Sequence, residues 1–426
     1  MEEFFKILMD PNFRYSVLGA MLLGAGAAAI GCFAFLKKQS LVGDAVAHAV
    51  LPGICVGFLL AGTKSTLALF AGALVTGWLS LEAIRIIRQR TRLKEDAAIA
   101  IVLSVFFGAG ILLLTMIQHS DNAQQAGLDK FLFGKAASLV EEDVQIFAVM
   151  TAIIFVLLYL FYKEFKIAAF DPQFSKSIGL PMRLIDFLQM ALIVVAVVAG
   201  IQAVGVVLMA AMLITPAATA RYWTNSLPKM IGLAVSMGVV AAVAGVAFST
   251  VAPKIPTGPS IVLAATFLFA ASLVLAPERG VMARAARHRR NYIRMQDENV
   301  LKTLYHLGEE SGDFLKSWTE KEILARRKMP PVFLKNSLRR LRRQGFLKES
   351  AGAWTLTPEG KRRGARVTKL HRLWEVYLTK YVNIAHDHVH DDAENMEHVL
   401  TPELEERLEQ LLEFPGTDPH DKTIPY

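Results

Sequence analysis

Nine apolar runs occupy the first part of the chain, and each is long enough to cross a membrane. They fall at roughly 15–36, 41–62, 66–84, 97–117, 144–162, 184–200, 202–220, 230–251 and 258–276. A helix needs about 20 apolar residues to cross the hydrocarbon layer, so the pattern predicts an all-α polytopic membrane domain over residues 1–276. Only the short break Gly200-Ile201-Gln202 separates the sixth and seventh runs, and one of them could be re-entrant. Eight and nine spans therefore remain alternatives.

The periodicity changes after residue 276. Leu334, Leu338 and Leu341 recur at helical spacing among basic residues, directly after the break Met329-Pro330-Pro331. Two short strands are expected next, near 346–349 and 353–357. A helix, a break, a basic helix and a β-hairpin, in that order, predict a winged helix-turn-helix.

The order of these elements predicts four regions. They are a transmembrane domain at 1–276, a basic juxtamembrane linker at 277–294, a winged helix-turn-helix at 295–365 and a helical region at 366–426.

Charge separates the chain further. The net charge of the whole chain is +8, but residues 277–372 hold 24 basic and 10 acidic side chains, whereas residues 373–426 hold 3 and 13. A single soluble globule and intrinsic disorder are both excluded by this division into apolar, basic and acidic regions.

Loop charge also predicts the orientation in the membrane. The loop at 85–96 is strongly basic and should lie in the cytoplasm, since basic loops are retained on that side. With nine spans, the loops on the same side of the membrane as 85–96 hold 13 Lys and Arg residues. The loops on the opposite side, together with the N-terminal segment, hold 6. The N-terminus is therefore expected outside the cell and the C-terminal region in the cytoplasm.

Two ionisable residues stand inside the second run. Asp44 and His48 are four residues apart and share one helix face. A carboxylate and an imidazole at this spacing can hold a divalent transition metal, form a proton relay or form a structural pair. The two cysteines, Cys32 and Cys55, both lie in apolar runs, so no thiolate zinc site is expected.

Several motifs in the membrane region resemble a known family. GDAVAHAVLPG around Asp44, KEDAAIAIVLS (94–104), KEFKIAAFDPQFSKSIGLP (163–181) and LITPAATA (213–220) resemble the permeases of ATP-binding-cassette importers for manganese, zinc and iron. The resemblance implies that Asp44 and His48 line the metal path, in a multi-pass protein of a bacterial cell (inner) membrane.

The same resemblance implies the partners of the chain. The residues expected to dock on the ATPase subunit are Phe170, Asp171, Pro172 and Gly179. No Gly-rich phosphate loop followed by Lys and Ser or Thr occurs in the sequence, so ATP hydrolysis is expected on a separate subunit and this chain is not an enzyme. An external metal-binding protein and a second permease, either another copy or a related one, complete the expected assembly.

The basic helix of the winged helix-turn-helix carries the candidates for DNA binding. Alternatively, these side chains form a solvated face, contact anionic membrane lipid or belong to a module that binds protein. The candidates are Lys335, Asn336, Arg339, Arg340 and Arg343.

The acidic C-terminal region carries a second set of possible metal ligands. His371 and Glu375 are four residues apart on one expected helix. A further set shares the face of another expected helix, namely His390, Glu394, Glu397 and His398. Imidazoles with carboxylates and no cysteine suit Mn²⁺, Fe²⁺ or Zn²⁺. The alternative is a solvated acidic helix.

This region is similar to the diphtheria-toxin-repressor family of metal-dependent regulators. The matching motifs are HRLWEVYL (371–378), VHDDAENMEHVL (389–400) and PHDKTIP (419–425). The similarity implies one metal site at His371, Glu375 and His390, a second at Glu394, Glu397 and His398, and dimerisation through 366–426. Glu394 replaces the Cys of iron-type members, Asn299 stands where the family has Met or Asp, and the SH3-like third domain is absent.

Together these features predict a permease for a divalent metal, manganese first, with zinc or iron as alternatives. The C-terminal part is expected to sense the same metal and to act on transport or on DNA. A membrane-tethered, metal-dependent transcription regulator is the second hypothesis.

Overall fold

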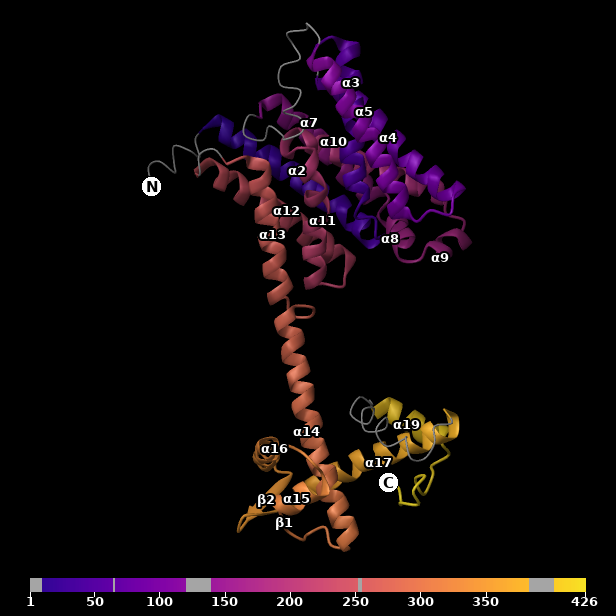
Figure 1. Ribbon diagram of the computed structural model, residues 1–426, viewed down its shortest axis with the longest axis vertical. Helices are drawn as coiled ribbons and strands as arrows, with labels where there is room; N and C mark the ends of the chain where they lie inside the picture. The colour runs from indigo at the N-terminus through magenta and orange to yellow at the C-terminus, as the bar shows by residue number, and fades with distance from the viewer. Residues whose placement is uncertain (1–9, 64–65, 120–138, 252–254, 383–401) are drawn as a thin grey trace. The chain divides into compact units, whose positions relative to one another are not determined.

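The chain forms two compact units, which a computed structural model describes for residues 10–63, 66–119, 139–251, 255–382 and 402–426. The membrane unit extends to Arg284 and the C-terminal unit runs from Ala285 to Tyr426 (Figure 1). Each unit has a hydrophobic core of its own, and each is described separately below.

The membrane unit is helical, and each of the nine apolar runs coincides with one long helix. The helices are α2 (Pro11–Leu36), α3 (Val42–Ala61), α4 (Thr66–Arg90), α5 (Glu95–Gln118), α7 (Glu141–Leu160), α8 (Tyr162–Phe170), α9 (Pro172–Ser177), α10 (Met182–Val204), α11 (Val206–Trp223), α12 (Leu227–Val251) and α13 (Thr257–Leu275). Among the described residues, eight helices are long and apolar enough to cross a membrane, and α11 is not one of them. The predicted polytopic fold is confirmed, and the number of crossings stays a prediction.

The break between the sixth and seventh runs lies at Gly205, a few residues beyond the expected position. Gly205 has φ 90°, a left-handed conformation that glycine adopts at little cost, and it separates α10 from α11. The expected break at Gly200-Ile201-Gln202 lies inside α10. Gly200 is instead a packing position, because a Cβ there would lie 2.1 Å from the sulfur of Met209.

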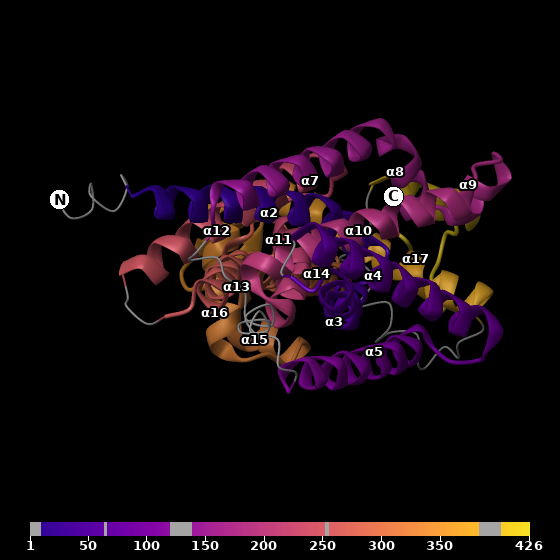
Figure 2. The same ribbon diagram turned by 90° about the horizontal axis from the view of Figure 1, so that it is seen from above.

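Glycines also allow α3 and α4 to approach each other closely. A Cβ on Gly53 would lie 2.1 Å from the carbonyl oxygen of Gly72, and the reverse substitution would meet the carbonyl of Gly53 at the same distance. On another side of α3 lies α5, and Figures 1 and 2 both show these two helices side by side. Helix α3 is therefore held between α4 and α5.

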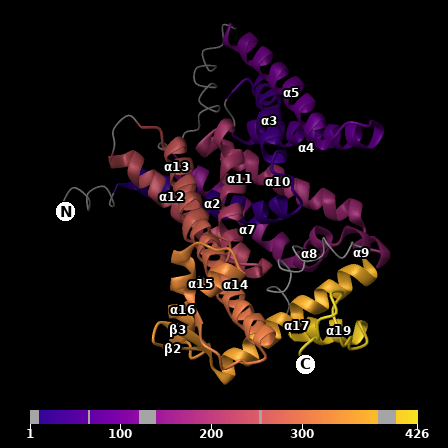
Figure 3. The same cartoon turned by 60° about the horizontal axis from the view of Figure 1, so that its bottom comes forward.

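The C-terminal unit contains the expected winged helix-turn-helix. Its elements are α14 (Val281–Ser311), which lies in this unit from Ala285 onward, β1 (Trp318–Thr319), α15 (Glu320–Arg326), α16 (Pro331–Arg343), β2 (Leu347–Ser350), β3 (Ala353–Leu356), α17 (Pro358–Tyr381) and α19 (Pro402–Leu411). The two expected strands form the antiparallel pair β2–β3, and β1, which the sequence did not predict, pairs with the other edge of β3. Figure 3 shows this hairpin beside α15 and α16.

Local signals explain these boundaries. Thr319 and Glu322 form a capping box at the start of α15, and Pro331 occupies the first turn of α16, where its missing N–H costs nothing. The leucines at 334, 338 and 341 are all buried in the core. The region expected as a linker at 277–294 is largely helical, because α14 begins at Val281 in a segment rich in Ala and Arg, both good helix formers.

Candidate functional site

Asp44 and His48 lie together in the first two turns of α3. The Nε2 atom of His48 is 3.6 Å from Oδ1 of Asp44, and the two side chains are 18% and 37% exposed respectively. This separation exceeds the 2.7–3.2 Å of an N–H···O hydrogen bond. Two ligands that share one metal ion at about 2.1 Å each lie roughly 3.0–3.5 Å apart. The pair is therefore spaced more like two metal ligands than like a hydrogen-bonded pair.

The second nitrogen of His48 has no conventional hydrogen bond. Its Nδ1 atom is buried and meets no hydrogen-bond partner among the described residues. The imidazole instead lies edge-to-face with the ring of Phe107 on α5, with 4.9 Å between ring centroids. A neutral imidazole in this setting can offer Nε2 to a cation without first breaking a hydrogen bond.

Neither cysteine contributes to this site. Cys32 points its thiol at the carbonyl oxygen of Ala28, 3.3 Å away, and Cys55 points toward the carbonyl of Gly110 at 3.8 Å. Both are reduced and buried. The donors available beside Asp44 and His48 are thus oxygen and nitrogen.

The segment expected to dock on an ATPase folds into two short helices, α8 and α9. Asp171 joins them, and its Oδ1 accepts a hydrogen bond of 2.8 Å from the backbone N–H of Phe174. Pro172 is in the first turn of α9, and Gly179 turns the chain with φ +79°. The ring of Phe170 is exposed, so the segment presents apolar surface on a rigidly capped turn. Its role in docking stays a prediction.

An ion pair that the sequence did not predict joins α2 and α10. Lys37 donates a hydrogen bond of 2.9 Å from Nζ to Oδ1 of Asp186, and the lysine side chain is only 14% exposed. The two residues are 149 positions apart, so no local pattern connects them. The pair fixes the end of α2 to the start of α10.

The winged helix-turn-helix exposes four of its five candidate DNA contacts. Lys335, Asn336, Arg339 and Arg343 are exposed on α16. The fifth, Arg340, turns inward and binds Asp297 of α14 with two parallel hydrogen bonds, at 3.0 Å from Nε and 2.7 Å from Nη2. Arg340 therefore holds α16 against α14, and DNA binding by the four exposed candidates stays a prediction.

One pair of the predicted regulatory ligands is assembled on α17. Nε2 of His371 lies 3.0 Å from Oε1 of Glu375, and each residue is 2% exposed. The expected partners His390, Glu394, Glu397 and His398 lie outside the described residues. Within the part of the chain that the structure covers, no group of three or more possible ligands gathers.

Asn299 on α14 is another buried polar residue of the C-terminal unit. It is 3% exposed, and its Oδ1 has no hydrogen-bond partner among the described residues. Such an orphaned acceptor suits a site that receives a cation or water. The buried His371–Glu375 pair by itself offers one nitrogen and one oxygen donor of the kind that a divalent metal of the manganese or zinc type accepts.

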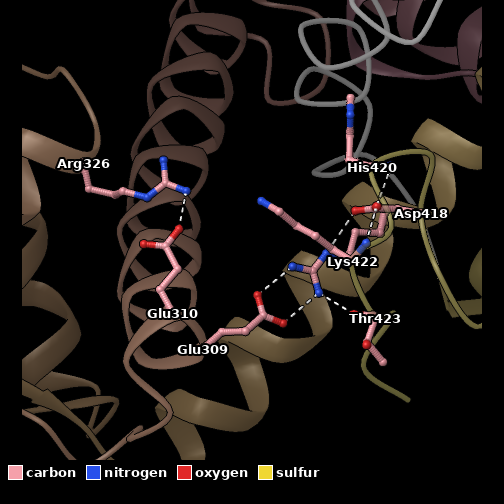
Figure 4. Close-up of polar contacts among 8 residues, drawn as sticks. Glu309, Glu310, Arg326, Asp418, His420, Lys422 and Thr423 are labelled. Carbon is pink, nitrogen blue, oxygen red and sulfur yellow. Dashed lines mark hydrogen bonds and ion pairs between the residues drawn. The ribbon is translucent and has the colours of Figure 1, made fainter.

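Arg372, next to His371, holds together three distant segments and was not foreseen from the sequence. It is 2% exposed. Its guanidinium binds Glu309 of α14 at 3.0 and 2.7 Å and lies 3.4 Å from Asp418. It also donates to the carbonyl oxygen of Thr423. Figure 4 shows Glu309, Asp418 and Thr423 around this guanidinium, with dashed lines for the contacts.

The charges around Arg372 act on a neighbouring histidine. Burial first, and then nearby lysine and arginine side chains, lowers the pKa of His306 from 6.5 to about 3. His306 is therefore neutral at physiological pH.

Two family descriptions match the chain. The ABC 3 transport family matches residues 9–276, and the iron dependent repressor, metal binding and dimerisation domain matches residues 357–426.

Individual proteins are similar over one or both regions. The manganese transport system membrane protein MntC of Bacillus subtilis is 41% identical over 422 residues, which cover 98% of this chain and 95% of that protein. The zinc transport system membrane protein TroC of Treponema pallidum is 45% identical over 290 residues, 68% of this chain and 97% of that protein. Among solved structures, PsaBC from Streptococcus pneumoniae in complex with Fab has a TM-score of 0.59 at 36% identity, covering 65% of this chain and 97% of that one.

Proposed function

Because the chain belongs to the ABC 3 transport family and carries a segment matching the iron dependent repressor domain, we propose that it imports manganese. It is a multi-pass membrane permease, and the alternative of a tethered regulator that does not transport is the less supported one. The observation that carries the proposal is the Asp44–His48 pair, with Nε2 and Oδ1 3.6 Å apart inside a membrane helix.

The chemistry of the pair suits transport more than storage. The Asp44 carboxylate offsets part of the charge of an ion that has lost water, and Nε2 of His48 supplies one further donor. Two ligands bind a divalent ion weakly enough for it to leave again, which conduction requires. Oxygen and nitrogen donors without thiolate suit Mn²⁺ and leave Zn²⁺ and Fe²⁺ as competitors. The similarity to MntC extends over nearly the whole chain, C-terminal unit included, and therefore favours manganese.

The partners follow from this function. An ATPase subunit docks on the segment from Phe170 to Gly179, where Asp171 caps α9 and exposed rings stand beside it. An external binding protein delivers the ion, and a second copy of the permease completes the pathway. The N-terminus lies outside the cell and the C-terminal unit in the cytoplasm, as the basic loop at 85–96 predicts.

The C-terminal unit senses the imported ion. His371 and Glu375 supply a nitrogen and an oxygen donor that are buried and 3.0 Å apart, and His390, Glu394, Glu397 and His398 supply the rest of the regulatory sites. A bound metal neutralises acidic groups of this region. Lys335, Asn336, Arg339 and Arg343 give the same unit a surface that suits the phosphates of DNA.

Metal uptake tests the transport function. Cells without their own manganese importers would carry the full chain with its ATPase and binding protein, and uptake of radiolabelled manganese would be measured. We expect Asp44→Ala and His48→Ala each to reduce uptake at least tenfold. His119→Ala, at the exposed end of α5, is the matched control and should transport normally. Normal uptake by both path variants would refute the transport path.

DNA binding is tested separately by fluorescence anisotropy of labelled duplex DNA against the full chain in nanodiscs. Arg339→Ala should weaken binding and reduce the slope of log affinity against log salt by about one. Binding that is unaffected by Arg339→Ala and Arg343→Ala would leave metal-dependent control of transport as the only task of the C-terminal unit.

A further inference from the structure

We propose that Phe107 on α5 is the positioning residue that orients the His48 imidazole toward the transported ion. The inference rests on the proposed function of Asp44 and His48 as the metal path. It adds a determinant of uptake affinity that lies on a different helix from the ligands.

The first observation is that no hydrogen bond fixes the His48 ring. Nε2 is 3.6 Å from the Asp44 carboxylate, and Nδ1 is buried without a hydrogen-bond partner in the described part of the chain. A histidine that binds metal usually donates its second N–H to a carboxylate or carbonyl, which sets the direction of the ring. Rotation about the Cβ–Cγ bond of histidine is otherwise broad. Some other contact must hold the imidazole.

That contact is the ring of Phe107. The two rings lie 4.9 Å apart between centroids with an interplanar angle of 82°. An edge-to-face pair at this distance is a preferred aromatic geometry, because the positive edge of one ring meets the negative face of the other. Turning the imidazole out of its plane would lose this contact. Phe107 therefore fixes the plane of the ring and with it the direction of Nε2.

Packing one turn further along α5 keeps the two rings together. A Cβ on Gly110 would lie 2.8 Å from Cγ of Leu51, and the Cys55 thiol is 3.8 Å from the carbonyl oxygen of Gly110. Only a residue without a side chain lets α5 come this close to α3. Much of the rest of α5 faces outward, as the exposed Val105 and Leu112 show. The contact with His48 is thus a specific feature of a peripheral helix.

Loss of the ring should change affinity more than turnover. An imidazole that is free to rotate must be ordered again each time an ion binds. Aromatic pairs contribute about 0.5–1.5 kcal/mol, which corresponds to a rise of roughly 2- to 12-fold in the KM for manganese uptake. The maximal rate should stay within about twofold, because Phe107 contacts neither the ion nor the ATPase segment.

The experiment is manganese uptake by the full transporter over a range of concentrations. Phe107→Leu keeps an apolar side chain but removes the ring, and it should raise KM by the stated factor. Phe107→Tyr keeps an aromatic ring at this position and should therefore keep the KM of the unchanged chain. Phe106→Leu is the matched control, because Phe106 is the adjacent aromatic residue and packs against the hydrophobic core. It should leave KM within twofold of the unchanged chain.

A second background tests whether Phe107 acts through His48. In chains that already carry His48→Gln, Phe107→Leu should raise KM no further, as expected for two residues that are energetically coupled. The proposal is overturned if Phe107→Leu raises KM equally with and without His48→Gln. It is also overturned if Phe107→Leu leaves KM unchanged, or if Phe106→Leu raises KM as much as Phe107→Leu does. If Asp44→Ala and His48→Ala themselves transport normally, the proposed path fails. If they fail to transport and Phe107→Leu is normal, only this inference fails.

Discussion

At the scale of single residues, Arg372 shows how one buried charge stabilises the C-terminal unit. Its guanidinium is 2% exposed and is shared by Glu309, Asp418 and the carbonyl of Thr423. A buried ion pair is not stabilising by itself, since desolvation offsets much of the attraction. Removing one partner is a different matter, because it leaves the remaining charges buried and unpaired.

We therefore expect Arg372→Met to lower the free energy of unfolding of the C-terminal unit by about 3–5 kcal/mol. Arg362→Met is the matched control on the same helix. Arg362 pairs with Glu359 at a site where the two side chains are 73% and 63% exposed, and such pairs contribute about 0–1 kcal/mol. Pulse proteolysis in urea, applied to the full chain in nanodiscs, measures both. Equal urea midpoints for the two variants would contradict the assigned role of Arg372.

The same residue marks the limit of what could be predicted from the sequence. The i,i+4 spacing was enough to bring Asp44 to His48 and His371 to Glu375, because a helix sets those distances locally. Arg372 and Glu309 are 63 positions apart, and Arg340 and Asp297 are 43 apart. Both contacts depend on how helices pack, which periodicity does not contain. For this reason the sequence pattern alone includes Arg340 among the DNA-binding candidates, although its guanidinium binds Asp297 of α14.

At the scale of elements, apolar length located every long helix of the membrane unit, because a span of about 20 apolar residues is imposed by the bilayer itself. The break between α10 and α11 was placed a few residues early. The position of the break depends on the backbone conformation of Gly205. Residue type alone does not distinguish Gly205 from Gly200. Strand β1 has only two residues and forms through pairing with β3, so it left no alternating pattern to detect.

The contact between α3 and α4 leads to a prediction about packing. Gly53→Ala would place a Cβ 2.1 Å from the carbonyl oxygen of Gly72, so one helix must move away from the other. Such overpacking typically costs about 1–3 kcal/mol, and we expect a lower thermal midpoint together with reduced manganese uptake. Gly108→Ala on α5 is the control, since nothing lies within 4 Å of its Cβ. A midpoint for Gly53→Ala equal to that of Gly108→Ala would refute the close approach.

The packing of α19 on α17 should depend on pH. Burial alone would raise the pKa of Glu405, but hydrogen bonds and charge from Lys369 and Arg366 bring that pKa below its ordinary 4.5. A carboxyl whose pKa is lower in the folded state contributes stability that is fully present above pH 4.5 and is lost as the pH falls through the folded value. We expect α19 amides to lose protection against hydrogen exchange on acidification below pH 4.5.

Hydrogen exchange with mass spectrometry, corrected for the intrinsic rate at each pH, measures this loss. Glu405→Gln removes the titrating group at nearly constant shape, so its α19 should be less protected at neutral pH and should respond less to acid. Glu406→Gln changes a neighbouring exposed carboxyl and should behave as the unchanged chain does. The same acid response in Glu405→Gln and in the unchanged chain would exclude Glu405 as the group responsible.

At the scale of the whole molecule, one chain carries a candidate transport site and a candidate sensor for the same ion, which predicts feedback. An ion can shift a conformational equilibrium only as far as it binds one state better than the other. A tenfold reduction of uptake requires a preference of at least about 1.4 kcal/mol for the state that does not transport. A regulatory site with His371 and Glu375 among its ligands can supply this difference.

The measurement is the initial rate of manganese uptake into vesicles that contain the full transporter, with and without manganese on the side of the C-terminal unit. Internal manganese should slow uptake about tenfold in the unchanged chain, which needs a preference of at least about 1.4 kcal/mol. His371→Ala and Glu375→Ala should abolish the slowing and leave the rate without internal metal unchanged. His288→Ala replaces an exposed histidine of α14 and should retain feedback. Because Asp44 and His48 are intact in all of these variants, slowing that persists in His371→Ala would come from occupation of the path itself. That result would reject the C-terminal unit as the sensor.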